Sequence, residues 1–237
     1  MANYDLFAEH YDIIMGDPID KVKFIKNLIH SHASNAKTVL ELACGTGAVL
    51  KQFEKEYEVF GLEFSPEMCK RAQEKFSEGV IVQGDMRSFS LDRRFDVVLC
   101  VFDSINHLLT LTEWEQTFIQ VKRHLTPEGV FIFDMNTAYC LQKKLEEPAW
   151  VKTFDGNTLH MKVKKDVENL VNWHVEIFKG VGENMTRFYE ENIKEVGFSV
   201  GEVLEVLEKH FSQIEIMDRT GQGVVDTTDR VFFVCRG

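Results

Sequence analysis

Short runs of β-branched and apolar residues alternate along the chain with longer segments whose apolar residues recur at helical spacing. Five runs have the length and composition of strands: 38–42, 58–62, 80–83, 95–102 and 130–134. The part at 97–102 is apolar at every position, which is typical of a strand covered by helices on both faces. This alternation predicts a mostly parallel sheet of the doubly wound α/β class.

Two of the intervening helices begin at recognisable signals. Ser65 is a good N-cap, and Pro66 follows it at the first helical position. Further along, the segment from Thr112 to Glu115 fits a capping box, and apolar residues follow it at helical intervals. Both signals predict helices that begin there and pack against the sheet.

The two flanks of the chain have different patterns. Residues 4–32 carry apolar side chains at helical intervals, so we expect residues 1–36 to form a helical cap over the ligand cleft. Within 140–200, apolar and polar residues alternate near 159–163, 173–177 and 187–196, which predicts an antiparallel insert after the fifth strand. We expect this insert to cover the substrate.

Helical spacing returns after the insert, and two further strands, at 214–217 and 230–235, would bring the sheet to seven strands. Residues 37–139 and 201–237 are therefore expected to form one Rossmann-like α/β domain that the insert interrupts. A chain of 237 residues is long enough for one such domain with an embellishment.

Composition narrows the possible partners. The chain has 38 acidic and 27 basic residues, a formal charge of −11, which repels a phosphate backbone and argues against a nucleic-acid partner. No apolar run is long enough to cross a bilayer, and the five cysteines contain no C-x-x-C pair. We expect a cytoplasmic protein without a membrane partner, disulfide or zinc site. A homodimer is possible.

The strongest chemical signal is the string E-L-A-C-G-T-G at 41–47, where a buried strand runs directly into two glycines. Glycines at this place let the backbone turn sharply and approach a ligand at the carboxyl edge of the sheet. Glu63 ends the next strand, where it can accept both hydroxyls of a ribose, unless it is a solvated surface residue. Asp85 follows the third strand, where it can accept from an adenine amino group, unless it serves only the turn.

These residues resemble the class I S-adenosylmethionine-dependent methyltransferase family, and the resemblance covers roughly 37–136. It implies that 41–47 cradles the amino-acid part of the cofactor, that Glu63 holds the ribose and that Asp85 reads the adenine. The residues expected at S-adenosylmethionine are Tyr11, Glu41, Ala43, Cys44, Gly45, Gly47, Glu63, Phe64, Gly84, Asp85, Met86 and Phe102. An early Tyr-Asp pair and a late antiparallel insert resemble the small-molecule branch that acts on glycine and amino sugars.

Other readings of the glycine turn stay open. An acid after the second strand also serves nicotinamide cofactors, but Leu50 stands where the dinucleotide pattern G-x-G-x-x-G/A needs a small third residue. A non-catalytic nucleotide-binding or regulatory protein would carry the same motifs, because all of them bind cofactor. Methylation of a nucleobase is disfavoured, since Phe102-Asp103-Ser104 replaces the Asn/Asp-Pro-Pro-aromatic signature of such enzymes.

For the chemistry we expect an in-line methyl transfer to an amine or hydroxyl of a small molecule, with a protein substrate as the alternative. His107 is the candidate base, Asp103 can orient it or the substrate, and Tyr11 can close the site. Each also has a plain structural interpretation, as a packed histidine, a cap or a core aromatic. Asp103, Asp134 and Asn136 can meet near the strand ends, but we predict no metal there.

Overall fold

The computed structural model describes residues 4–5, 7–77, 80–167, 169–180 and 185–237. Its larger sheet has seven strands in the order β10-β11-β5-β4-β1-β2-β3. These are β1 (Thr38–Leu42), β2 (Glu58–Glu63), β3 (Ile81–Gln83), β4 (Phe95–Cys100), β5 (Leu125–Asn136), β10 (Gln213–Asp218) and β11 (Arg230–Arg236). Neighbours are parallel from β3 to β5, and β11 is antiparallel to β5 and β10. The predicted mostly parallel seven-stranded sheet is confirmed.

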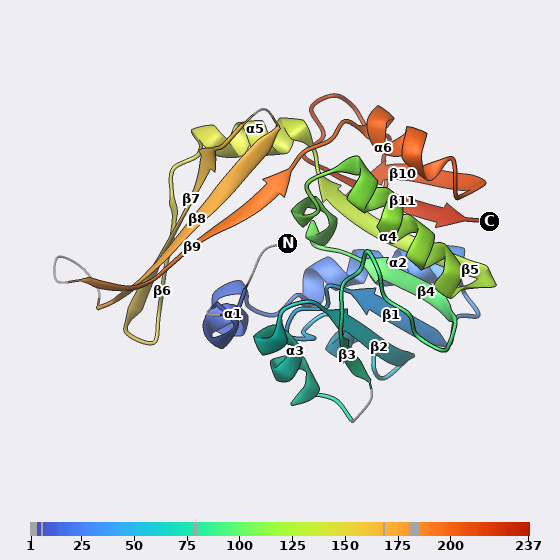
Figure 1. Ribbon diagram of the computed structural model, residues 1–237, viewed down its shortest axis with the longest axis horizontal. Coiled ribbons are helices and arrows are strands. Elements are labelled where there is room, and N and C mark those ends of the chain that lie inside the picture. Colours follow the sequence, from blue (N-terminus) through green and yellow to red (C-terminus); the bar gives the residue numbers. More distant parts are fainter. Residues whose placement is uncertain (1–3, 6, 78–79, 168, 181–184) are drawn as a thin grey trace.

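Helices cover both faces of this sheet (Figure 1). On one face lie α2 (Ile19–His32), the short 3-10 helix η1 (Leu50–Gln52) and α3 (Pro66–Gln73), and on the other lie α4 (Leu111–His124) and α6 (Val200–Leu207). Val22 and Ile29 of α2 belong to the same buried cluster as Val39 of β1. Each such fully buried side chain contributes about 1.5–3 kcal/mol through removal from water. The doubly wound prediction is therefore confirmed.

The N-terminal segment divides into two helices with different positions. Helix α2 packs its apolar side on the sheet, while α1 (Ala8–Met15) lies at the carboxyl edge of the sheet, beside the second sheet of the molecule (Figure 1). The expectation that the whole segment covers the cleft was wrong for most of α2, because four apolar residues of this helix are buried in the sheet-facing core.

The two helix-start signals had different outcomes. Ser65 Oγ accepts from the backbone N–H of Met68 at 3.2 Å, so α3 begins as predicted. Helix α4 begins two residues earlier than predicted, with Thr110 as its N-cap and Glu113 completing the capping box. The acid that the predicted box needed, Glu115, instead bonds His210 at 3.0 Å.

The insert forms a separate antiparallel sheet in the order β6-β7-β8-β9. Its strands are β6 (Trp150–Phe154), β7 (Asn157–Lys165), β8 (Leu170–Lys179) and β9 (Thr186–Val196). The sequence predicted the last three but not β6, nor the preceding helix α5 (Ala138–Glu146). The inner face of this sheet shares a buried cluster with Phe7 and Ile14, so α1 is packed between the two sheets. Among the described residues, no helix is long and apolar enough to cross a membrane.

Candidate active site

The chain makes its glycine turn directly after β1. Ala43, Gly45 and Gly47 have φ values of 53°, 56° and 76°, in the left-handed region that favours glycine. At Gly47 there is also no room for a side chain, since a Cβ would lie 2.7 Å from Cε2 of Phe76. The turn thus brings a stretch of bare backbone to the carboxyl edge of the sheet.

Glu63, at the end of β2, fastens this turn. Its Oε2 accepts from the backbone N–H of Gly45 and its Oε1 from that of Ser65, both at 2.8 Å. The residue is 7% exposed, and burial raises the pKa of its carboxyl while the backbone N–H groups act in the opposite direction. Glu63 is therefore a buried, oriented acceptor rather than a solvated surface acid.

A cavity of about 130 Å³ opens above the turn, and we call it the glycine-turn cavity. Nine of the residues expected at the cofactor line it: Tyr11, Glu41, Ala43, Cys44, Gly45, Glu63, Phe64, Met86 and Phe102. Phe64 is 42% exposed, which leaves an aromatic face free for a planar ligand. The wall thus combines backbone, two carboxylates and apolar side chains.

Glu41 supplies the clearest sign of a missing partner. It is buried, and its Oε2 has no hydrogen-bond partner among the described residues. Burial, together with the nearby charge of Glu63, raises the pKa of this carboxyl well above its usual value. A buried unpaired acceptor is costly, so this oxygen fits a ligand that brings a cationic N–H donor.

The remaining three expected cofactor residues, Gly47, Gly84 and Asp85, lie outside the lining of that cavity. Asp85 forms an ion pair with Arg87, with Nη2 2.6 Å from Oδ2, and Arg87 also bonds Glu113. Although partial burial opposes it, the hydrogen bonds and charge of Arg87 lower the pKa of Asp85. The Asp85 carboxylate is thus already engaged by Arg87.

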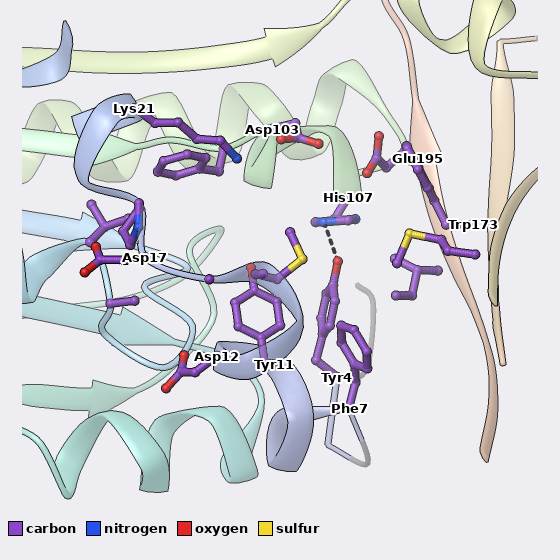
Figure 2. A pocket seen from close by; sticks show the side chains of 18 of the residues that line it. Tyr4, Phe7, Tyr11, Asp12, Asp17, Lys21, Asp103, His107, Trp173 and Glu195 are labelled. Carbon is purple, nitrogen blue, oxygen red and sulfur yellow. Dashed lines mark hydrogen bonds between the residues drawn. The ribbon is translucent and has the colours of Figure 1, made fainter. Parts of the chain in front are cut away.

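A second cavity of about 280 Å³ lies between α1, the 3-10 helix η2 (Ser104–His107) and the inner face of the insert sheet (Figure 2). We call it the insert cavity. The two cavities share lining residues, namely Tyr4, Tyr11, Ala48, Val49, Phe102 and His107. They therefore adjoin through a common wall at the carboxyl edge of the sheet.

His107 stands in this common wall. Its Nδ1 lies 3.1 Å from the backbone oxygen of Lys194, which can only accept, so Nδ1 carries the proton. The other nitrogen, Nε2, then accepts from the hydroxyl of Tyr4 at 3.2 Å. Loss of solvation lowers the pKa of His107, which keeps the ring neutral. The structure thus turns the basic nitrogen of His107 toward the Tyr4 hydroxyl, within the common wall of the two cavities (Figure 2).

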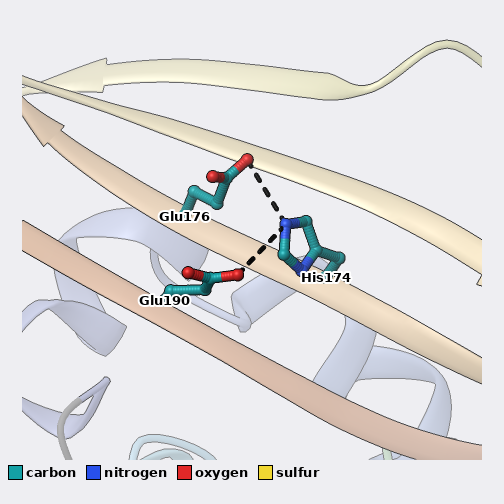
Figure 3. Close-up of side chains that lie close together, drawn as sticks. All are labelled: His174, Glu176 and Glu190. Carbon is teal, nitrogen blue, oxygen red and sulfur yellow. Dashed lines mark ion pairs between the residues drawn. The ribbon is translucent and has the colours of Figure 1, made fainter. Parts of the chain in front are cut away.

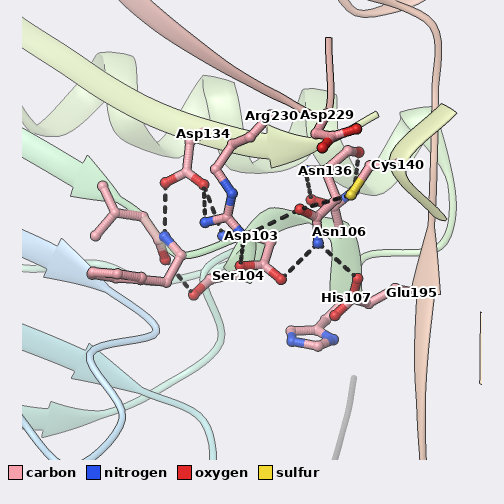
Figure 4. Close-up of polar contacts among 12 residues, drawn as sticks. Asp103, Ser104, Asn106, His107, Asp134, Asn136, Cys140, Glu195, Asp229 and Arg230 are labelled. Carbon is pink, nitrogen blue, oxygen red and sulfur yellow. Dashed lines mark hydrogen bonds and ion pairs between the residues drawn. The ribbon is translucent and has the colours of Figure 1, made fainter. Parts of the chain in front are cut away.

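The turn after β4 is held by a buried acid (Figure 4). Phe102 and Asp103 have φ values of 60° and 56°, a strained conformation for residues with side chains. Asp134 accepts from both of their backbone N–H groups, at 2.7 and 3.1 Å, and from Arg230 at 2.9 Å. Burial raises the pKa of Asp134 to about 6, although Arg230 opposes this shift.

Arg230 connects this acid to other polar residues at the insert cavity. Its Nη2 donates to Asp103 at 2.6 Å, and Asn136 donates to Asp103 at 2.8 Å and to Glu195 at 3.2 Å. The three oxygen-bearing residues that the sequence could bring together thus do meet, around a guanidinium. Arg230 and Glu195 were not among the site residues predicted from the sequence. A buried acid in the apolar strand β5 was a signal that a cation must lie nearby.

The chain is similar in sequence to known methyltransferases. A family model described as "Methyltransferase domain" matches residues 39–129. Over 196 residues, the chain is 31% identical to dTDP-3-amino-3,4,6-trideoxy-alpha-D-glucopyranose N,N-dimethyltransferase of Streptomyces venezuelae, covering 81% of this chain and 73% of that protein. It is also 30% identical to the putative methyltransferase YqeM of Bacillus subtilis over 223 residues, which are 84% and 88% of the two chains.

Among solved structures, an S-adenosylmethionine-dependent methyltransferase from Clostridium acetobutylicum matches with a TM-score of 0.79 and 26% identity over 98% of both chains. The chain belongs to the class I S-adenosylmethionine-dependent methyltransferases. Within that family it is of the small-molecule branch, and its cofactor is S-adenosylmethionine. The nicotinamide and non-catalytic readings are thereby set aside.

In this methyltransferase, α1 is fastened on both sides. Asp12 accepts from the Thr46 hydroxyl of the glycine turn at 2.5 Å and from Lys75 Nζ at 2.6 Å. At the opposite end, Lys152 of the insert donates to the backbone oxygen of Ile14 at 2.6 Å, where a helix end favours a cation. The helix thereby joins the glycine turn to the insert sheet.

A second polar cluster of the methyltransferase faces away from both cavities (Figure 3). His174 lies with Nε2 3.5 Å from Glu176 and 3.8 Å from Glu190, on the outer face of β8 and β9. Arg187 pairs with both carboxylates, at 2.8 and 2.9 Å, so its guanidinium offsets part of their negative charge. We assign this cluster to the surface of the insert rather than to the active site.

Proposed function

We propose that this methyltransferase transfers a methyl group from S-adenosylmethionine to the amino group of a small molecule held in the insert cavity. The observation that carries the proposal is the common wall of the two cavities, in which Tyr11, Phe102 and His107 contact both. A cofactor in one cavity and an acceptor in the other would meet at this wall, which is the arrangement that an in-line transfer needs.

The glycine-turn cavity offers a partner for each end of the cofactor. Glu63, already oriented by two backbone N–H groups, keeps lone pairs for the ribose hydroxyls. The unpaired Oε2 of Glu41 matches the cofactor's ammonium group. The exposed ring of Phe64 and the side chain of Met86 offer apolar surface to the adenine. Asp85 would have to leave Arg87, whose Nη2 lies 2.6 Å from its Oδ2, in order to read the adenine.

The bound cofactor supplies an electrophilic methyl group on a positively charged sulfur. The chain's own residues then have to position the acceptor and exclude water. Helix α1 covers the common wall, and its tie to Thr46 holds that cover against the glycine turn. His107 Nε2 gives the acceptor a hydrogen-bond acceptor in place of Tyr4, and the tie of Nδ1 to Lys194 fixes the ring.

An amino sugar is the substrate class that we favour. The Streptomyces relative is named for an N,N-dimethyltransferase activity on a dTDP-linked amino sugar. A cavity of about 280 Å³ also fits a small ligand better than a folded protein segment. The second relative carries no substrate in its name, so the sugar class rests on the first relative and on the cavity.

Transfer of an isotopically labelled methyl group tests this function. The purified protein is incubated with deuterated-methyl S-adenosylmethionine and, separately, the dTDP-linked amino sugar, the unlinked amino sugar and the matching hydroxyl sugar. Mass spectrometry should place the label on nitrogen of at least one amino sugar. Label on the hydroxyl sugar, or on the protein fraction of a lysate instead, would contradict the proposal.

A further inference from the structure

Glu195 is a buried acid of the insert cavity that was not among the site residues predicted from the sequence. It lies on the inner face of β9, is 4% exposed and lines the cavity. Figures 2 and 4 both show it beside His107 and Asp103. Its Oε2 accepts a hydrogen bond from the Asn136 amide, at 3.2 Å. A buried carboxyl in this position faces the place where an acceptor would sit.

The charges around the cavity leave Glu195 without a cation. The cationic side chains of the lining are Lys21 and Arg230. Lys21 Nζ lies over the Phe102 ring, 5.1 Å from its centroid, and Arg230 pairs with Asp103 at 2.6 Å and Asp134 at 2.9 Å. In the described part of the chain, Glu195 forms no ion pair. The positive charge of Arg230 is therefore balanced by two other acids, and the cavity has an unbalanced acid at its inner end.

We infer that Glu195 binds the acceptor's amino group and receives the proton that the nitrogen must lose before it attacks. This assignment rests on the proposed function and narrows the substrate class. The acceptor is then an amine that is protonated in solution, and a neutral hydroxyl is not a substrate. Asp103 also lines the insert cavity and adds negative charge, but it already accepts hydrogen bonds from Arg230 and Asn136.

The proton balance of the step is simple. A bound ammonium gives one proton to the Glu195 carboxylate, which leaves a neutral amine and a carboxylic acid. The nitrogen lone pair then forms the new N–C bond, and the electrons of the broken C–S bond stay on sulfur. The product leaves as a methylated ammonium, and Glu195 releases its proton to water when the cavity opens.

The surroundings of Glu195 favour this proton transfer from the ammonium to the carboxylate. Burial, and then the charge of Asp103, raise the pKa of Glu195 to about 8, while Asn136 and Arg230 act against the shift. Simple amines have pKa values of about 8 to 10, so proton transfer between the two groups is nearly balanced. The other titratable groups that face it are His107, which is neutral, and Tyr4, whose pKa burial raises.

Trp173 gives the cavity a donor as well. Its indole Nε1 is buried and has no hydrogen-bond partner of normal geometry among the described residues, although it lies near enough to Glu195 to favour the charged carboxylate. Trp173 pairs across the sheet with Ile193 on the same inner face as Glu195. An acceptor with an oxygen close to its amino group, as in an amino sugar, would satisfy both side chains.

The first experiment observes Glu195 directly. The protein is labelled with carboxyl-¹³C glutamate, bound to S-adenosylhomocysteine, and the Glu195 signal is identified by its loss in Glu195→Gln or, if that variant does not fold, Glu195→Asp. Glucosamine should shift this signal toward the charged form, and glucose should not. A Glu195 signal that does not shift when glucosamine is added, or that shifts equally with glucose, overturns the inference.

The second experiment separates this inference from the proposed function. Glu195→Gln keeps an oxygen for Asn136 but cannot take a proton, so kcat/KM for an accepted amine should fall about 100-fold or more, as loss of a base does. Cofactor affinity should be unchanged, and the control Glu190→Gln, on the outer face of the same strand, should keep its activity. Full activity of Glu195→Gln on an amine would contradict the role of Glu195 and leave the proposed function standing. Transfer of the labelled methyl group to a hydroxyl would contradict the proposed function itself.

Discussion

Glu63 offers a sharp test of how the cofactor is held, because one side chain has two tasks. It fastens the glycine turn through the N–H groups of Gly45 and Ser65, and we expect it to accept the ribose hydroxyls. Glu63→Gln keeps the size and one oxygen but replaces the second acceptor by an NH₂ group. Only one of the two backbone N–H groups then finds an acceptor.

The size of the effect follows from the burial of this site. A buried N–H left unpaired costs about 1–3 kcal/mol, so the free energy of unfolding should fall by that amount without cofactor. A lost acceptor for one ribose hydroxyl should cost about 1–3 kcal/mol again, which raises the Kd for S-adenosylmethionine about 5- to 150-fold. The two losses are separable, because the first appears without cofactor.

Urea unfolding of the cofactor-free protein and calorimetry with S-adenosylmethionine measure the two losses. The matched control is Glu67→Gln, an exposed acid in the first turn of α3. It should leave the Kd unchanged and lower the free energy of unfolding by no more than about 0.3–1 kcal/mol, the contribution of an acid at a helix N-terminus. A Glu63→Gln protein that is less stable but binds the cofactor with the wild-type Kd would refute the ribose role and leave Glu63 as a fastener of the turn.

Three further predictions concern the turn, the cover and the cavity. Gly47→Ala should lower the free energy of unfolding by about 1–3 kcal/mol because of its left-handed φ and lack of space, whereas Gly201→Ala, with open space in α6, should raise it by about 0.5–1 kcal/mol in urea unfolding. Asp12→Asn should weaken S-adenosylmethionine binding and speed amide exchange in α1, while Glu9→Gln, exposed on the same helix, should do neither. Because the pKa of Glu195 rises from 4.5 to about 8 on folding, its contribution to stability is complete below 4.5 and is lost as pH rises through 8. The decline of the free energy of unfolding between pH 4.5 and about 8, measured by urea unfolding, should be flatter in Glu195→Gln.

The parallel sheet and the cofactor turn could be predicted from the sequence because their signals are local. A buried strand that runs into G-T-G, and an acid at the end of the next strand, leave little freedom in how the backbone can run. Glu63 was found for the same reason, since the carboxyl end of a parallel strand fixes where its last side chain lies. The apolar spacing of residues 22–29 predicted a helix but not its partner, which turned out to be the sheet.

Two polar residues of the insert cavity, Glu195 and Arg230, could not be predicted in this way, because they come from distant segments of the chain. Glu195 stands between Lys194 and Val196 in β9, and only the packing of the insert against α1 decides which face of that strand is buried. Arg230 appeared to be the first residue of a strand, and its role depends on the antiparallel pairing of β11 with β5. Asp85 shows the reverse case, in which a neighbour two residues away, Arg87, engages the predicted side chain.

We propose that cofactor and acceptor occupy the two cavities and meet at their common wall. A crystal structure of the protein with S-adenosylhomocysteine and the amino sugar that it methylates tests this arrangement most directly. We expect the ribose hydroxyls on Glu63, the ammonium of the cofactor product on Glu41, and the sugar nitrogen between the sulfur and Glu195. A sugar bound outside the insert cavity, or with its nitrogen turned away from Glu195 and the sulfur, would contradict it.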